Sequence, residues 1–177
     1  YIDRYEVSNE RMRQTMQYAH DQGLLLAGPS GVTNAVGEPH ELLNLDDAAS
    51  KIEFGGGVFS VEAGSENFPC AMVTWYGAMA YCSYLSQSQG LADCVDMADW
   101  SCDFSANGYR LPTEAEWEKA ARGGLVDHYF PWNSSGGSWS NHVDGSKANY
   151  QGSADPYDNG TTPLGYYNGS QTPPGSD

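Results

Sequence analysis

Basic side chains are scarce in this sequence. The 177 residues include 8 lysines and arginines against 23 aspartates and glutamates, which gives a formal net charge of −15 at pH 7. Nucleic acids and anionic membrane surfaces both attract a positively charged protein surface, so this balance argues against either as a partner. Cations are the better match for such a chain.

A long hydrophobic run is also missing. No stretch approaches the 18 or more apolar residues of a membrane-spanning helix, so no membrane span is predicted. The 12% of aromatic residues and the 21 glycines are typical of a folded, loop-rich domain. We expect a single domain over residues 1–177. We expect it to be incomplete at the C-terminus, where residues 172–177 do not resemble the end of a domain, and at the N-terminus, which lacks an initiator Met.

Metal-binding cysteine patterns are absent too. The four cysteines lack the C-x-x-C or Cys/His spacing of a structural zinc site. Cys94 and Cys102 flank a short loop that a disulfide could close, which would stabilise the fold by about 2–3 kcal/mol. Such a bond requires an oxidising compartment, so a periplasmic or secreted location is expected. Cys82 is expected to be a buried small hydrophobic residue.

Two helices are predicted from hydrophobic spacing. The first begins after Ser8 or Asn9 and ends near Gln22, before a glycine. The second follows Thr74, a suitable N-cap, and carries a stripe of apolar residues at helical spacing: Trp75, Ala78, Met79, Cys82 and Leu85. Such a stripe is far more often part of a core than a ligand site, so this one is assigned to the core.

A third helix is specified at both ends. Thr113 and Glu116 have the Thr-x-x-Glu spacing of a capping box, and Gly123 stands where a left-handed residue ends a helix. A helix this short is only marginally stable in water unless it packs against the rest of the protein. Its Trp117 is therefore expected to be buried. We predict that Trp75 and Trp117 anchor their helices to one shared core.

Short strands complete the predicted fold. Residues 1–7 are expected to form a strand, and residues 51–54 and 58–62 a hairpin around three glycines. Residues 28–45 show little periodicity and are assigned to a surface loop. Helices and strands that do not alternate regularly indicate an α+β fold with much irregular backbone.

Three segments in order resemble the formylglycine-generating enzyme, or sulfatase-modifying factor, family. They are YIDRYEVSN from Tyr1, VTWYGAMAYC from Val73, and RLPTEAEWEKAARGG from Arg110 followed by Phe130-Pro131-Trp132. The resemblance covers essentially the whole chain. It implies a C-type-lectin-like fold, in which two or three helices pack on a small twisted antiparallel sheet and long loops carry the function.

The resemblance also implies a reaction for the parent protein. Family oxidases use oxygen and two closely spaced cysteines, which bind copper(I), to convert a peptidyl cysteine in sulfatases to formylglycine. Thiolates are soft ligands and suit copper(I). None of this chain's cysteines matches those positions, so no catalytic residue is assigned, and copper is expected only if further cysteines follow. The partner would be a protein or peptide substrate. The alternative is a non-catalytic, lectin-like binding or scaffold module of the bacterial envelope, with a glycan or protein ligand.

A structural calcium site is the one site that the resemblance places inside this chain. Family members commonly bind calcium in loops that correspond to residues near Asn149 and Tyr150 and near Asp155 and Asp158. These residues offer amide, carbonyl and carboxylate oxygens, which calcium prefers. The composition alone leaves a solvated acidic loop open as the alternative.

Overall fold

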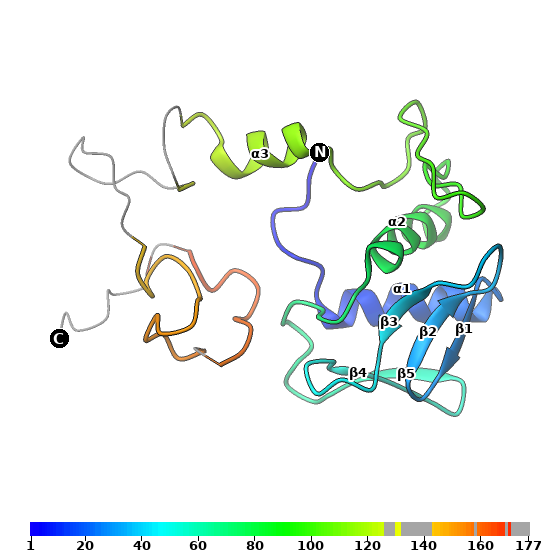
Figure 1. The fold of residues 1–177 in the computed structure, drawn as a ribbon, viewed down its shortest axis with the longest axis horizontal. Coiled ribbons are helices and arrows are strands. Elements are labelled where there is room, and N and C mark those ends of the chain that lie inside the picture. The colour runs from blue at the N-terminus through cyan, green and yellow to red at the C-terminus, as the bar shows by residue number, and fades with distance from the viewer. Residues whose placement is uncertain (126–129, 132–142, 158, 169, 171–177) are drawn as a thin grey trace. The chain divides into compact units, whose positions relative to one another are not determined.

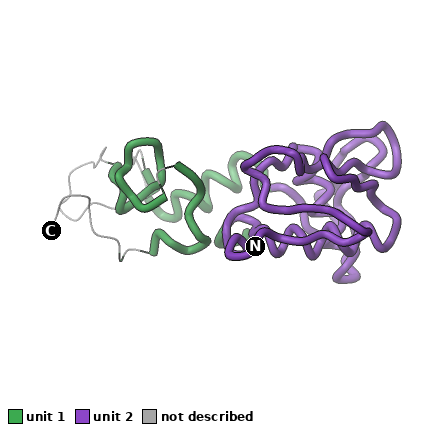
Figure 2. The backbone as a smooth tube through the Cα atoms, turned by 90° about the horizontal axis from the view of Figure 1, so that it is seen from below, with its two compact units in different colours: residues 1–5, 112–177 green, residues 6–111 purple. Residues whose placement is uncertain are grey.

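The computed structural model describes residues 1–125, 130–131, 143–157, 159–168 and 170. The chain divides into two compact units (Figure 2). The larger unit consists of residues 6–111, and the smaller unit of residues 1–5 and 112–177. None of the helices within the described ranges is long and apolar enough to cross a membrane.

The elements confirm the predicted α+β class (Figure 1). The larger unit contains two helices and five short strands: α1 (Asn9–Asp21), β1 (Leu25–Gly28), β2 (Gly31–Asn34), β3 (Glu41–Asn44), β4 (Ile52–Gly55), β5 (Val58–Val61) and α2 (Trp75–Ser88). The smaller unit contains α3 (Glu114–Arg122). All the strand pairs are antiparallel.

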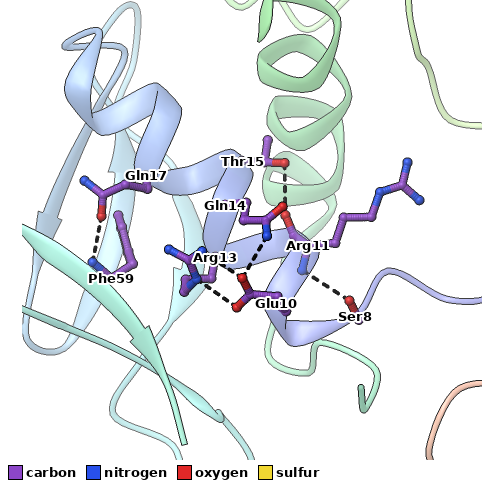
Figure 3. Close-up of polar contacts among 8 residues, drawn as sticks. All are labelled: Ser8, Glu10, Arg11, Arg13, Gln14, Thr15, Gln17 and Phe59. Carbon is purple, nitrogen blue, oxygen red and sulfur yellow. Dashed lines mark hydrogen bonds and ion pairs between the residues drawn. The ribbon is translucent and has the colours of Figure 1, made fainter. Parts of the chain in front are cut away.

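Polar contacts fix the start and the position of α1 (Figure 3). Ser8 caps the helix as predicted, because its hydroxyl accepts a hydrogen bond from the backbone N–H of Arg11 at 3.1 Å. Near the other end, the side-chain oxygen of Gln17 accepts a hydrogen bond from the N–H of Phe59 at 2.8 Å. The amide nitrogen of Gln17 also donates to the carbonyl of Gly57 at 3.3 Å. One glutamine therefore ties α1 to the β4–β5 hairpin.

A three-stranded sheet, in the order β1-β2-β3, lies where the sequence predicted a surface loop over residues 28–45. That prediction is wrong. Each strand has only four residues, and short connections that contain proline or glycine separate them, so no long alternation marks them in the sequence. The side chains of Val32, Leu42 and Leu43 are nevertheless fully buried.

The predicted hairpin is confirmed as β4 and β5. Gly55 pairs with Val58, so Gly56 and Gly57 form a two-residue turn. Their φ angles are 61° and 83°, and two successive positive values are what a tight hairpin turn requires.

The predicted strand over residues 1–7 does not form. Ser8 makes a single antiparallel bridge to Pro69, and the N–H of Cys70 donates to the carbonyl of Val7 at 2.8 Å. Within residues 1–7 no ladder of pairs continues this contact, so the segment stays irregular.

The hydrophobic core of the larger unit draws on both helices and both sheets. Its least exposed members are Met16, Ala19, Val32, Leu42, Leu43, Ile52, Phe59, Ala80 and Tyr84. Residues 79–86 of α2 are all buried, so the helix is surrounded by the core on almost every side. The spacing predicted burial of one face only. Met79, Cys82 and Leu85 lie in the core as predicted.

Helix α3 in the smaller unit has the predicted ends. The hydroxyl of Thr113 accepts from the N–H of Glu116 at 3.3 Å, and the carboxylate of Glu116 accepts from the N–H of Thr113 at 2.8 Å, which completes the capping box. Gly123 ends the helix with a φ of 59°. None of the nine residues of α3, all of them described, is buried, and Trp117 is 61% exposed.

Candidate functional site

The predicted calcium loop lies in the smaller unit. The side-chain amide of Asn149 donates to the carbonyl of Gly160 at 2.7 Å, and the carbonyl of Tyr150 accepts from the N–H of Ser153 at 2.9 Å. These bonds join residues 149 and 160, and residues 150 and 153, in the segment that also holds Asp155. Asp158 lies outside the described residues.

Asp155 is buried and both of its carboxylate oxygens accept hydrogen bonds inside this loop. Oδ1 accepts from the N–H of Tyr157 at 2.6 Å, and Oδ2 accepts from the hydroxyls of Ser153 at 2.5 Å and Tyr167 at 3.1 Å. The bond from Ser153 is the main reason why the pKa of Asp155 is lowered. Burial, and then the same carboxylate, raise the pKa of the Tyr167 hydroxyl.

The donor set of the loop fits calcium in kind, because it offers an amide, a main-chain carbonyl and an ionised carboxylate. Within the described ranges, no three His, Cys, Asp or Glu side chains converge on a metal site. The predicted shell consists of Asn149, the carbonyl of Tyr150, and Asp155 or Asp158. That shell stays a prediction.

The predicted Cys94–Cys102 disulfide does not form; all four cysteines are described, and no disulfide joins them. An antiparallel bridge pairs Val95 with Cys102, and the N–H of Asp103 donates to the carbonyl of Cys94. In this register Val95, and not Cys94, lies directly opposite Cys102. Cys94 Sγ instead lies 3.1 Å from the carbonyl oxygen of Gly108. The expected periplasmic or secreted location stays a prediction.

Two thiols of the larger unit, those of Cys70 and Cys94, are poorly suited to bind a soft metal. Burial raises the pKa of Cys70 to about 12, and burial also raises the pKa of Cys94. A copper(I) ligand must be a thiolate, which these environments disfavour. Cys70 and Cys94 are therefore poor candidates for the copper pair that the resemblance implies.

Four aromatic side chains from three separate segments meet at the surface of the larger unit. We call them the aromatic surface cluster: His40, Trp75, Tyr76 and Trp100. The ring of His40 stacks on Tyr76 with centroids 3.8 Å apart and an interplanar angle of 13°. The indole of Trp100 contacts Tyr76 at 4.8 Å and His40 at 5.5 Å, both edge to face. Tyr76 and Trp100 pack partly on the core, whereas Trp75 is 54% exposed.

The first turn of α2 positions two of these rings. Thr74 caps the helix by accepting from the N–H of Gly77 at 3.0 Å. Its hydroxyl also donates to the carbonyl of Glu41, and its N–H donates to the carbonyl of Leu42 at 3.2 Å. The turn that carries Trp75 and Tyr76 is thereby fixed to β3, next to His40.

A tight loop positions Trp100. The N–H of Trp100 donates to the carbonyl of Asp96 at 2.7 Å, and the side chains of Asp96 and Asp99 each accept a bond from a backbone N–H two residues further on, at 2.8 and 2.9 Å. Trp100 has a φ of 62°, which is unusual for a bulky residue. Such strain persists only where the surroundings enforce it, and it gathers at functional sites.

Sequence reasoning missed this cluster and misplaced one member. Trp75 was assigned to the core together with Trp117, and both predictions are wrong, because more than half of each indole is exposed. Trp75 stands on the first turn of α2 and faces Tyr76 and Trp100 rather than the core. In the smaller unit, α3 is the one helix or strand among the described residues, so none of these elements covers Trp117. The available signal for the loop of Trp100 was the pair of turn-forming residues before it, Asp96 and Asp99.

Short antiparallel sheets, helices with specified ends and long loops define the class as a small α+β domain of the C-type-lectin-like kind. The chain belongs to the sulfatase-modifying factor family, because the model of the sulfatase-modifying factor enzyme 1-like domain matches residues 1–172.

Similar proteins carry different names. The serine/threonine-protein kinase pkn1 of Chlamydia caviae is 31% identical over 128 residues, which are 72% of this chain and 15% of that protein. The formylglycine-generating enzyme of Mus musculus is 39% identical over 66 residues, which are 37% of this chain and 12% of that protein. The crystal structure of CarF covers 68% of this chain and 43% of its own, with a TM-score of 0.46 and 26% identity. The chain spans less than a sixth of the length of the two curated relatives.

Proposed function

We propose that this chain is a ligand-recognition domain of a formylglycine-generating-enzyme-like protein, and that the aromatic surface cluster holds its protein, peptide or glycan ligand. The observation that carries the proposal is the half-exposed indole of Trp75, supported by three rings that are fixed to the core and to β3. Tryptophan and tyrosine supply much of the binding energy of protein interfaces at a low entropic cost.

The environment of the thiols supports recognition over redox chemistry for these residues. Burial raises the pKa of both Cys70 and Cys94, and no disulfide joins the four described cysteines. The similarity to a protein named as a kinase is also consistent with a domain that serves different parent proteins.

The test is a pair of arrays, one of peptides and one of glycans, probed with the chain and with two variants. Trp75→Ala removes the exposed ring of the cluster, and Trp117→Ala is the matched control, since it removes an equally exposed indole elsewhere. We expect at least one class of ligand whose signal falls with Trp75→Ala and persists with Trp117→Ala. If no bound ligand depends on Trp75, the proposal is wrong.

The second candidate is an oxygen-dependent oxidase that converts a peptidyl cysteine to formylglycine. The identity with the mouse formylglycine-generating enzyme favours it. Its copper-binding pair would have to come from outside these 177 residues. The full-length protein, given copper(I), oxygen and a Cys-x-Pro-x-Arg peptide, would then consume oxygen and yield an aldehyde detectable by mass spectrometry. An inactive full-length protein that binds copper(I) would count against this candidate.

We also propose a structural calcium ion bound by Asn149, the carbonyl of Tyr150, Asp155 and Asp158. An ion that binds the folded chain but not the unfolded chain raises the melting temperature. We expect millimolar calcium, but not magnesium, to stabilise the chain, and Asn149→Ala to abolish the effect. An unchanged melting temperature would exclude a structural ion in this loop.

A further inference from the structure

We propose that the aromatic surface cluster binds a positively charged side chain, an arginine or lysine from a basic peptide segment. The inference rests on the proposed recognition function and names the chemistry of its ligand. Three independent observations support it: the arrangement of the rings, the charge of the surrounding chain, and the rigid backbone beneath Trp100.

More than half of the Trp75 side chain is exposed and can contact a ligand. Tyr76 lies at 77° to the indole of Trp75 with centroids 5.2 Å apart, and Trp100 lies at 56° with centroids 6.4 Å apart. Neither neighbour therefore stacks in parallel on the indole, and 54% of Trp75 is exposed. A cation over the face of an indole is attracted by the ring quadrupole, and tryptophan is the strongest partner among the aromatic residues. A planar guanidinium can also stack on such a face.

The chain around the cluster is acidic and supplies almost no cation of its own. Residues 14–50 and 52–109, which include all four rings, contain no lysine or arginine, and residues 52–109 alone contain seven aspartates and glutamates. Asp96 and Asp99 belong to the loop of Trp100, and Glu41 follows His40 in the sequence. Arg110, the next basic residue along the chain, lies 4.8 Å over the ring of Phe104. This local excess of acidic residues, in a chain of net charge −15, favours a basic ligand over an acidic one.

The backbone that carries Trp100 is held in place by contacts within the chain, without a ligand. The loop of Trp100 is held by main-chain bonds from Trp100 to Asp96 and from Asp96 to Ser101, at 2.7 and 3.0 Å. Gly37, with a φ of 80°, approaches this loop so closely that an added Cβ would lie 3.3 Å from the carbonyl oxygen of Met97. A rigid site loses little conformational entropy on binding, which matters for a ligand held by a few weak contacts.

The experiment compares two peptides that differ only in charge. One is a tetra-arginine peptide, and the other replaces each arginine with citrulline, which keeps the planar shape and removes the charge. Affinity is measured by isothermal titration for the unaltered chain, for Trp75→Ala and for Trp117→Ala. A second cluster variant, Trp100→Gly, removes the indole with a residue that accepts a φ of 62°. Circular dichroism confirms that each variant folds.

We expect the arginine peptide to bind and the citrulline peptide to bind markedly more weakly. Loss of either indole of the cluster should weaken arginine binding about two- to fivefold, and raised salt should weaken it further, whereas Trp117→Ala should leave the affinity unchanged. Equal binding of the two peptides, or Trp75-dependent binding of glycans alone, would overturn the cationic ligand and leave the recognition function standing. If no peptide or glycan depends on Trp75, both proposals fail.

Discussion

The α carbon of Gly77 faces the carbonyl oxygen of Leu42 so closely that a Cβ added to Gly77 would lie 1.9 Å from that oxygen. This contact brings the first turn of α2 against β3. It lies within the segment that resembles the sulfatase-modifying factor family, two residues after Trp75. The position of the Trp75 indole thus depends on a glycine at position 77, where a side chain of even one methyl group would not fit.

Gly77→Ala is expected to destabilise the larger unit by about 3 kcal/mol or more, because neither the helix nor the strand can move without disturbing the core. Gly28→Ala is the matched control, since an added Cβ there meets nothing within 4 Å. Chemical denaturation followed by far-UV circular dichroism measures both. Similar stabilities for the two variants would show that α2 does not dock on β3 as described.

Tyr84→Phe removes a buried hydroxyl. Tyr84 is 1% exposed, and its hydroxyl donates to the carbonyl of Leu24 at 3.1 Å. The substitution leaves that carbonyl with one partner fewer, so a loss of about 1 kcal/mol in unfolding free energy is expected. Tyr109→Phe, which removes a hydroxyl bonded to the exposed side chain of Gln89, should cost less. Urea denaturation of both variants makes the comparison, and an equal cost would contradict it.

The stability of the smaller unit should fall in acid. Asp144 accepts hydrogen bonds from the backbone and hydroxyl of Ser146 and from Lys147 at 3.0 Å, and these bonds, Ser146 first, lower its pKa to about 2. A carboxyl with a lowered pKa stabilises the fold above its unfolded pKa of about 4, and this contribution is lost as the pH falls toward 2. Asp144→Asn should therefore cost about 1 kcal/mol at pH 7 and little at pH 2. Thermal unfolding between pH 7 and 2 tests this, and a variant whose deficit does not shrink in acid would refute it.

Cys70 should resist alkylation in the folded chain. Burial raises its pKa to about 12, so at pH 8.5 the reactive thiolate is rare. Iodoacetamide labelling followed by peptide mass mapping should modify Cys70 on the order of a hundredfold more slowly in the native chain than in urea. Because the folded pKa is raised, this burial stabilises the fold below the unfolded pKa of about 9 and destabilises it as the pH rises toward 12. Equal labelling rates in the two states would mean that the thiol is exposed.

Local signals predicted the helices well. Ser8, Thr74 and Thr113 cap their helices as expected, and Gly123 ends the last one. These features depend on residues three or four apart, so they are legible in the sequence. The β4–β5 hairpin was equally legible because its turn consists of adjacent glycines.

Long-range relationships were not predictable in the same way. The sheet of β1, β2 and β3 consists of four-residue strands, and its stability comes from tertiary burial of Val32, Leu42 and Leu43. The aromatic surface cluster brings His40 into contact with Tyr76, 36 positions later, and with Trp100, 60 positions later. No local sequence pattern predicts contacts over such distances along the chain. The cysteine spacing suggested a disulfide, but the pairing of Val95, rather than Cys94, with Cys102 is a tertiary feature that the spacing does not reveal.

The most direct test of the account is a two-dimensional NMR titration that follows the indole N–H signals while the tetra-arginine peptide is added. Recognition at the aromatic surface cluster predicts progressive, saturable shifts of the Trp75 and Trp100 signals, with the Trp117 signal unmoved. Shifts confined to Trp117, or no shift of Trp75 at saturating peptide, would contradict it.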